Sequence, residues 1–363
     1  CRLAGSLGYT RVLLVTDSFL AGSGLLDGIT GELEAAGVEH TVFDGVEPDP
    51  AFEQVEAGEA MLRQSKCQAV FAVGGGSVLD AAKMIAILHT NPAKLKFFDG
   101  IQKAKKPGLT VFAMPTTAGT GSETTPVSVI TDSGTHRKIA VADGKLVPHY
   151  VALDPDLMKS MPPHITASTG MDALTHAVES WLSKASSPSS RELAGTATRL
   201  IVEHLPRAFA DGNDMESREA MALASFYAGI AFGRTSVGYA HAIAHQLGRV
   251  CGTPHGDANA MVLPEVLTAY GPCVHELLAE LAETAGVGDP SADAATRARQ
   301  FIDHIAQLRS DLRMKLKPEG LDAGAIPGIV KAARAEAGDL YPVQRYLSAA
   351  EIRALVERLL PAA

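Results

Sequence analysis

The sequence predicts an α/β domain followed by an all-helical domain, and two patterns indicate this order. Short β-branched runs alternate with helical segments over the first half of the chain, which is typical of a doubly wound parallel sheet. Strand patterns stop after residue 154, and helices separated by Gly, Pro and Asp follow. A chain of 363 residues suits two domains, which we place at residues 1–162 and 163–363.

The first domain contains four predicted strands, and each leads into a helix or a glycine-rich loop. The strands are residues 11–16, 38–43, 69–73 and 109–114, and the helices between them are residues 25–36, 51–64 and 78–88. In a doubly wound parallel sheet, ligands bind at the carboxyl ends of the strands. We therefore expect a Rossmann-like domain with its binding loops along that edge.

The second domain is predicted to be helical throughout. A segment with three prolines, residues 151–164, precedes it. The predicted helices are residues 165–182, 190–210, 217–233, 239–247 and 258–270, with more to residue 360.

Composition narrows the class of protein. Hydrophobic residues make up 46% of the chain and charged residues 20%, so a sizeable core is expected. A net charge of −9 argues against nucleic acid and anionic membranes as partners. The four cysteines lie too far apart for a CxxC zinc site or a disulfide framework. With no apolar run long enough for a bilayer and no signal peptide, we expect a cytoplasmic protein.

Two histidine-containing helices carry the strongest signal. Asp172 and His176 are four residues apart in a segment without proline, so both side chains project from one helix face. His241 and His245 repeat this spacing, and His255 follows in a predicted turn. Either pair alone is more often an ion pair or a packing feature. A carboxylate with three imidazoles suits Zn(II) or Fe(II), and it does not suit calcium or magnesium.

Other residues near these histidines have expected supporting roles. Asp257 could cap the helix of residues 258–270, which would leave His255 in the preceding turn. Glu179 could hydrogen-bond one of the histidines and fix its tautomer.

Two loops of the first domain suit a phosphate-containing ligand. Gly74, Gly75, Gly76 and Ser77 follow the strand of residues 69–73 and open a helix. Glycines let the backbone approach an anion, and a helix amino terminus supplies free N–H donors. The turn is not GxGxxG, and such a turn alone is more often only a tight connection. A second loop, residues 116–120, offers threonine hydroxyls, although it could be a solvated turn.

These blocks together resemble the iron-containing alcohol dehydrogenase family over about residues 11–270, through GGGSVLD, PTTAGTGSE, GMDALTHAVE, HAIAHQLG and TPHG. The resemblance implies that the metal ligands are Asp172, His176, His241 and His255. It implies that the cofactor-binding residues are Asp17, Gly74, Gly75, Gly76, Ser77, Asp80, Thr116, Thr117, Thr120 and Lys138. Family members have a strand and turn before this point, so we expect residues before Cys1.

The family implies a metal-dependent oxidoreductase that transfers hydride between NAD(H) and a small primary alcohol or aldehyde. Fe(II) is the expected metal, with Zn(II) also suitable. Asp17 ends the first strand, where a carboxylate accepts from ribose hydroxyls and repels a 2′-phosphate, so NAD is expected over NADP. The alternative is that Asp17 is an ordinary loop aspartate without a role in cofactor binding. A homo-oligomer, a dimer or larger, is also implied, with the metal facing the nicotinamide between the domains.

Two further residues have candidate roles in the reaction. His245, one turn from His241, could relay a proton to water, or it could be a packing histidine. Phe232 stands where the family narrows the substrate entrance, although a phenylalanine is more often part of a core.

Three other classes of function compete with this prediction, and the first comprises two related enzymes of the same superfamily. A zinc polyol (glycerol-type) dehydrogenase lacks one of the four ligands, and a dehydroquinate synthase needs more Lys and Arg than these motifs contain. A metal-dependent hydrolase would leave the Gly and Thr loops without a role, and no HExxH is present. A non-catalytic metal or nucleotide binding protein would not oxidise NADH.

Overall fold

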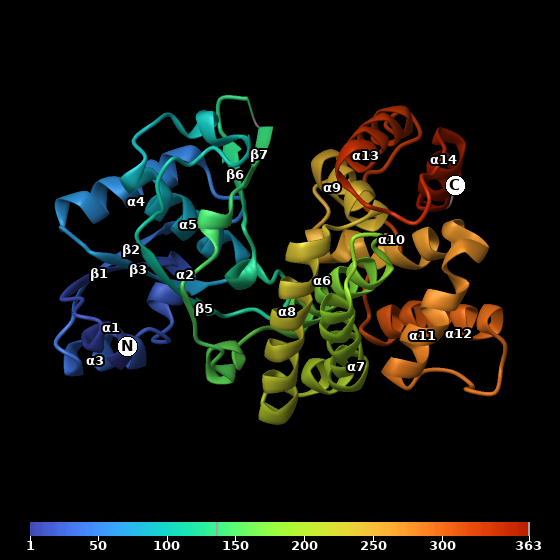
Figure 1. Cartoon of the computed structure of the whole chain (residues 1–363), viewed down its shortest axis with the longest axis horizontal. Helices are drawn as coiled ribbons and strands as arrows, with labels where there is room; N and C mark the ends of the chain where they lie inside the picture. Colours follow the sequence, from blue (N-terminus) through green and yellow to red (C-terminus); the bar gives the residue numbers. More distant parts are fainter. Residues whose placement is uncertain (136, 362–363) are drawn as a thin grey trace. The chain divides into compact units, whose positions relative to one another are not determined.

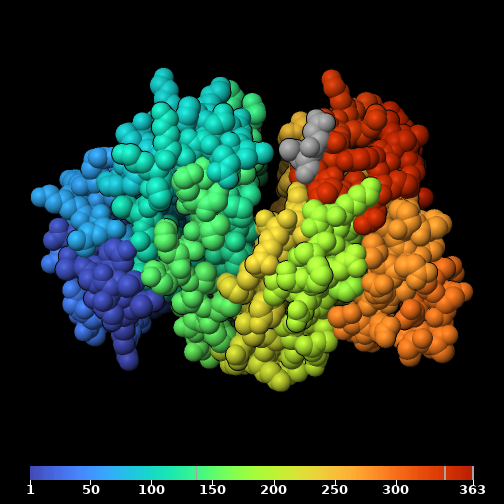
Figure 2. Space-filling model, viewed as in Figure 1, coloured from blue at the N-terminus to red at the C-terminus, as the bar shows by residue number. Residues whose placement is uncertain are grey.

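The computed structural model describes residues 1–135 and 137–361, and it divides into two compact units (Figure 1). Unit 1 comprises Cys1–Thr117 and Ser122–Met158, and unit 2 comprises Ala118–Gly121 and Lys159–Ala363. Each unit has a core of buried hydrophobic side chains, and Figure 2 shows the atoms on one outer face of the molecule. Among the described residues, no helix has both the length and the apolar character needed to cross a membrane.

A five-stranded parallel sheet forms the centre of unit 1, in the order β2–β1–β3–β5–β8. The strands are β1 (Arg11–Asp17), β2 (Glu39–Val46), β3 (Ala69–Gly74), β5 (Thr110–Pro115) and β8 (Tyr150–Val151). Because all five run in one direction, the segments that follow β1, β3 and β5 leave from the same edge of the sheet.

Alternate residues of the strands pack on opposite faces of this sheet. Leu13 and Val70 point into a core with α4 (Phe52–Gln64) and α5 (Gly76–Thr90). Leu14 and Phe71 point to the other face, where α3 (Asp27–Ala35) covers them. The sheet is therefore buried on both faces, which confirms the predicted doubly wound α/β fold.

Unit 1 also contains elements that the sequence analysis does not predict. A second sheet has the order β4–β7–β6, from β4 (Gly100–Ile101), β6 (Val127–Asp132) and β7 (Arg137–Ala142). Its strands are short, but Ile130, Ile139 and Val141 complete the core around α5. Short helices α1 (Arg2–Ser6) and α2 (Ser18–Gly22) and four 3₁₀ turns, Leu95–Phe98, Ser122–Thr124, Gly144–Leu146 and Pro155–Met158, complete the unit.

Unit 2 is helical in its described residues, as predicted, with the 3₁₀ turn Gly271–Val274 as one connection. Its helices are α6 (Pro163–Leu182), α7 (Pro188–Ala210), α8 (Met215–Thr235), α9 (Tyr239–Cys251), α10 (His255–Tyr270), α11 (His275–Ala285), α12 (Ala294–Asp311), α13 (Ile326–Leu340) and α14 (Ala349–Arg358). Helix α6 is buried along almost its whole length, with α7, α8 and α10 packed against it (Figure 1).

His255 lies in a helix, so the predicted turn at this position is wrong. Helix α10 begins at His255 after the N-cap residue Pro254, and Asp257 lies inside the first turn without capping it. A Cβ at Gly256 would lie 2.0 Å from the carbonyl oxygen of Ser168 on α6. Glycine therefore lets the first turn of α10 approach α6, which seats His255 beside that helix.

A buried lysine ties α5 to the segment after the threonine loop. Lys83 Nζ donates to Ser122 Oγ at 2.7 Å and to the Val127 carbonyl at 2.9 Å. The same Nζ lies 3.6 Å from Asp80 Oδ1, which accepts from Ser122 Oγ at 2.6 Å. Asp80 Oδ2 accepts from the Val129 N–H at 2.8 Å. Since Lys83 is 1% exposed, these bonds are shielded from water.

We expect Lys83→Met to lower the free energy of unfolding by about 3 kcal/mol, because it leaves Asp80 as a buried carboxylate without its cation. Urea-induced unfolding followed by circular dichroism measures this. Lys138→Met is the matched control, since Lys138 makes an exposed ion pair with Asp49 at 2.5 Å and its loss should cost below about 1 kcal/mol. If both variants lowered the free energy of unfolding equally, the buried hydrogen bonds of Lys83 would contribute no more to stability than an exposed ion pair, which would contradict the prediction.

Candidate functional site

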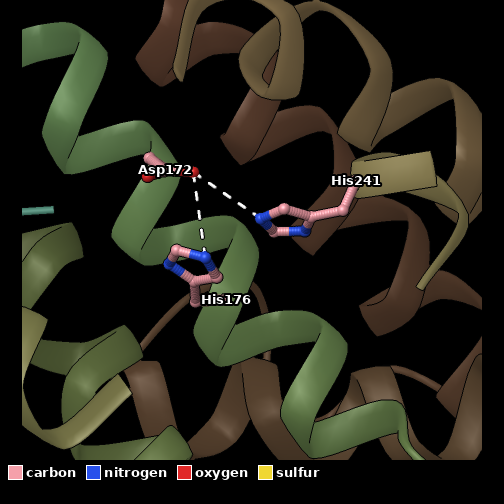
Figure 3. A group of neighbouring side chains, drawn as sticks. All are labelled: Asp172, His176 and His241. Carbon is pink, nitrogen blue, oxygen red and sulfur yellow. Dashed lines mark ion pairs between the residues drawn. The ribbon is translucent and has the colours of Figure 1, made fainter. Parts of the chain in front are cut away.

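Three buried side chains from two helices meet in unit 2 (Figure 3). Asp172 and His176 project from one face of α6, and His241 comes from α9. Asp172 Oδ1 lies 4.0 Å from His176 Nε2 and 3.6 Å from His241 Nε2. Their ligand atoms all lie within 4.8 Å of one another, which is close enough for the three to hold one metal ion.

His255 lies at the edge of this buried group. Its Nε2 is 3.3 Å from Asp172 Oδ1, and its ring centre is 5.3 Å from that of His241. The side chain is 42% exposed, whereas that of Asp172 is 4% exposed. The structure thus brings the three predicted histidine ligands around the carboxylate of the fourth, Asp172, with His255 on the solvent side.

The protonation states suit a cation at this position. Burial alone would raise the pKa of Asp172, but the imidazoles of His176, His255 and His241 hold it well below its usual value. Burial lowers the pKa of His176 to about 3. Burial also acts to lower the pKa of His241, but Asp172 and Glu179 outweigh it and raise the value to about 9. A metal would take the place of the His241 proton.

Glu179 orients His241 for this role. His241 Nδ1 lies 2.6 Å from Glu179 Oε2, and the Gly238 and Ala240 N–H groups donate to the same carboxylate at 2.7 Å each. The hydrogen bond expected for Glu179 is therefore present. With Nδ1 engaged, Nε2 is left buried, and it has no hydrogen-bond partner in the described part of the chain. Such a nitrogen is costly to bury and suits a metal ligand.

Asn259 is a neighbour that the sequence analysis missed. Its Nδ2 donates to Asp172 Oδ1 at 2.8 Å and lies 3.2 Å from His255 Nε2. The residue is fully buried on α10, one turn after His255. The spacing of four residues from His255 is a signal that could have identified it.

Phe232 and His245 also lie beside the group. The Phe232 ring stacks on His176 with 4.0 Å between ring centres and 11° between planes. The His245 ring stacks on His255 with 5.2 Å and 16°. His245 is 43% exposed, so it borders both the buried donors and solvent.

The threonine loop continues into unit 2 beside α6. A Cβ at Gly119 would lie 2.5 Å from Thr169 Cβ, and one at Gly121 would lie 2.7 Å from Gly229 Cα on α8. Gly121 also has a φ of +62°, which favours glycine. Thr120 belongs to this inserted segment, whereas Thr116 and Thr117 belong to unit 1.

The glycine-rich turn lies at the carboxyl edge of the parallel sheet. Helix α5 begins at Gly76, earlier than predicted, with Gly75 as its N-cap and Ser77 in its first turn. A Cβ at Gly74 would lie 2.6 Å from Val78, so only glycine fits there. The Thr116 N–H donates to the Gly74 carbonyl at 3.0 Å, which places the two predicted cofactor loops side by side.

Three predicted cofactor residues are already engaged within unit 1. Asp17 ends β1, and its Oδ1 caps α2 by accepting from the Leu20 N–H at 2.9 Å. Both carboxylate oxygens of Asp80 accept hydrogen bonds within the protein. Lys138 lies on β7 in its ion pair with Asp49.

A doubly wound sheet with a glycine-rich turn and a helical unit with a carboxylate–imidazole group indicate a nucleotide-dependent metalloenzyme. The chain belongs to the iron-containing alcohol dehydrogenase family. The family model described as "Iron-containing alcohol dehydrogenase" matches residues 2–155, and "Fe-containing alcohol dehydrogenase family, C-terminal" matches residues 166–360. These matches confirm the family and the class of enzyme, and they do not favour the competing functions.

Known proteins are similar over most of the chain. An NAD-dependent methanol dehydrogenase of Bacillus methanolicus is 40% identical over 82% of this chain and 78% of its own. A crystal structure of 1,3-propanediol oxidoreductase has a TM-score of 0.95 with 36% identity, covering 99% of this chain and 94% of that chain. A sulfoacetaldehyde reductase from Bifidobacterium kashiwanohense, solved with NAD⁺, has a TM-score of 0.88 with 30% identity, covering 98% and 93%.

We expect Glu179→Gln to weaken metal affinity by about 10- to 100-fold, because an amide holds the His241 tautomer less firmly than a carboxylate. His241→Ala should lose metal and turnover together. Metal titration and elemental analysis measure both effects. Glu203→Gln, an exposed change on α7, is the matched control and should leave affinity unchanged. Stoichiometric metal in His241→Ala would show that the ligand assignment is wrong.

Proposed function

We propose that this protein transfers hydride reversibly between NAD(H) and a small primary alcohol or aldehyde, using a metal ion held by Asp172, His176, His241 and His255. The observation that carries the proposal is the buried Asp172 carboxylate, toward which His241 presents an unpartnered nitrogen. Membership of the family supports the reaction, and the donor set suits Fe(II) first and Zn(II) also.

The residues that would hold the metal set the net charge of the site and the orientation of its ligands. A divalent cation held there would polarise the oxygen of an alcohol or aldehyde. With the cation in place of the His241 proton, Asp172 would contribute one negative charge and the three neutral imidazoles none, so the site would keep a net positive charge. Glu179 holds the His241 tautomer, and Asn259 donates to Asp172, so these ligands are oriented before substrate binds.

Unit 1 supplies the binding site for NAD in this proposal. The glycine-rich turn of residues 74–77 and the amino terminus of α5 take the pyrophosphate, through bare N–H groups and the helix dipole. Thr116, Thr117 and Thr120 line the nicotinamide and its ribose. The NAD-dependent relative and the NAD⁺-bound structure support this cofactor.

Asp80 and Lys138 remain predicted cofactor residues on the family resemblance. Asp80 accepts hydrogen bonds from Ser122 and Val129, so its proposed role is to hold the segment after the threonine loop in place and not to contact the cofactor directly. The prediction that the metal faces the nicotinamide between the two domains, divided at residues 162 and 163, also stays a prediction.

His245 moves the proton and Phe232 borders the substrate in this proposal. A half-exposed imidazole beside the metal ligands can exchange protons with water, which the buried histidines cannot. Phe232 stacks on His176 and gives the substrate an apolar wall.

The proposed substrate is a short unbranched alcohol or its aldehyde. The names of the relatives include methanol, 1,3-propanediol and sulfoacetaldehyde, all small molecules with a terminal oxygen on carbon. We also propose that the protein is cytoplasmic and a homodimer or larger oligomer. Its cysteines are all free, as a reducing compartment would keep them.

Metal removal and reconstitution tests the function. Protein stripped with a chelator should lose NAD reduction by small primary alcohols, and added Fe(II) or Zn(II) should restore it, because the cation supplies the charge on oxygen. Absorbance of NADH measures turnover across a series of alcohols. Full activity in stripped protein with verified metal removal would contradict the proposal.

Cofactor choice tests Asp17. We expect Asp17→Gly to raise kcat/KM for NADP relative to NAD by about tenfold, which corresponds to about 1.4 kcal/mol, because the charge that repels a 2′-phosphate is lost. Asp17→Ser keeps a side chain able to cap α2 and still removes the charge, so it should show the same relaxation. If Asp17→Gly alone changed the ratio, the helix cap and not the charge would be responsible.

A further inference from the structure

Helix α13 contributes a carboxylate to the candidate proton relay. Glu336 Oε1 lies 2.6 Å from His245 Nδ1, although 91 residues separate the two in the chain. The quoted family motifs end at about residue 270, and Glu336 follows them within residues 166–360, which the C-terminal family model matches. Helix α13 packs directly on α9, which carries both His241 and His245.

The Glu336 carboxylate is itself held by other side chains. Tyr341 donates from its hydroxyl to Oε1 at 2.6 Å, and Gln246 donates from Nε2 to Oε2 at 3.0 Å. Arg249 Nε in turn donates to Gln246 Oε1 at 3.2 Å. Both carboxylate oxygens are therefore engaged, and the carboxylate can rotate only by breaking these bonds.

The charge on Glu336 favours one tautomer of His245. Burial alone would raise the pKa of Glu336, but the hydrogen bonds from His245 and Tyr341 outweigh it and keep the pKa below its usual value. Tyr341 stays protonated, because burial and the neighbouring carboxylate raise its pKa well above the ordinary value. A carboxylate anion can only accept, so Nδ1 of His245 carries a proton and Nε2 is left to take up another.

The same arrangement occurs twice on α9. His241 Nδ1 is bound to Glu179 from α6 at 2.6 Å, and His245 Nδ1 is bound to Glu336 from α13 at 2.6 Å. The side chain of His241 is 3% exposed and that of His245 is 43% exposed. Each histidine of the pair thus has its own glutamate. Glu179 binds the buried His241, whose other nitrogen suits a metal, and Glu336 binds the half-exposed His245.

We propose that Glu336 is a positioning residue for the reaction. It fixes the tautomer and ring orientation of His245, while Tyr341 and Gln246 keep Glu336 in place. Helix α13 thereby becomes part of the catalytic apparatus without touching metal, cofactor or substrate. This inference rests on the proposed function of His245 in moving the proton.

A double-mutant cycle tests whether Glu336 acts through His245. Glu336→Met should lower kcat by about 10- to 100-fold, as the loss of an orienting carboxylate does elsewhere, with unchanged metal content and unchanged KM for NAD. In a His245→Ala background the same change should have no further effect on kcat. Glu336→Gln, which keeps a neutral acceptor for Nδ1–H, should recover part of the loss. Glu357→Gln on α14 is the exposed control.

The His245 tautomer supplies a readout that does not depend on turnover. Histidine-selective ¹⁵N spectra of the metal-free protein, assigned with His245→Ala, should show Nδ1 protonated in the parent and a shift toward Nε2 protonation in Glu336→Met. Tyr341→Phe, which leaves the bond between His245 and Glu336, should keep the parent tautomer.

The outcomes separate the inference from the proposed function. Equal losses from Glu336→Met in both backgrounds, or an unchanged tautomer, would overturn the inference and leave Glu336 as a structural contact of α13. Unchanged kcat in His245→Ala would instead remove His245 from the reaction, and with it any catalytic role of Glu336. Two results together support the inference and the proposed function: Glu336→Met shifts the tautomer, and it lowers kcat only when His245 is present.

Discussion

A buried carboxylate is the constraint on which unit 2 depends. Removing Asp172 from water is costly unless other groups compensate its charge. Helices α6, α9 and α10 supply those groups, since His176, His241, His255 and Asn259 all surround its Oδ1. The helices can approach closely because small residues lie at their crossings. A Cβ at Gly238, the N-cap of α9, would lie 2.7 Å from Glu179 Oε1 of α6, and one at Gly256 of α10 would meet the Ser168 carbonyl of α6. The close packing of these helices brings the compensating groups to Asp172, and those groups in turn make its burial tolerable.

Burial divides the work between two histidines of one helix. His241 and His245 each follow an alanine, and each has a glutamate carboxylate at Nδ1. His241 is enclosed, so its free nitrogen has no access to water and suits a cation. His245 is half-exposed, so its free nitrogen can exchange protons with solvent. The same pair of groups thus occurs in two surroundings that the neighbouring helices set, and the two proposed roles follow from this difference in burial.

Unit 1 holds its two predicted cofactor loops in place through hydrogen bonds and close packing. The glycine-rich turn and the threonine loop leave neighbouring strands at the same edge, and a backbone hydrogen bond joins them. Lys83 of α5 donates a hydrogen bond to Ser122. This serine directly follows residues Ala118–Gly121, which belong to unit 2. A Cβ at Gly74 would meet the Val78 side chain, and within unit 2 a Cβ at Gly119 or Gly121 would meet Thr169 or Gly229. Loops held in this way are oriented before a ligand binds, which lowers the entropy cost of binding.

The sequence by itself determined the strand–helix alternation, the glycine-rich turn and the Asp172–His176 and His241–His245 pairs, because these depend on local periods of two and 3.6 residues. Tertiary structure decided the rest. It placed His255 inside a helix and brought Asn259 to Asp172 across 87 residues and Glu336 to His245 across 91. It also paired the short strands β6 and β7 and enclosed Lys83. Such contacts depend on how helices cross and which faces meet, and no local pattern in the chain encodes that geometry.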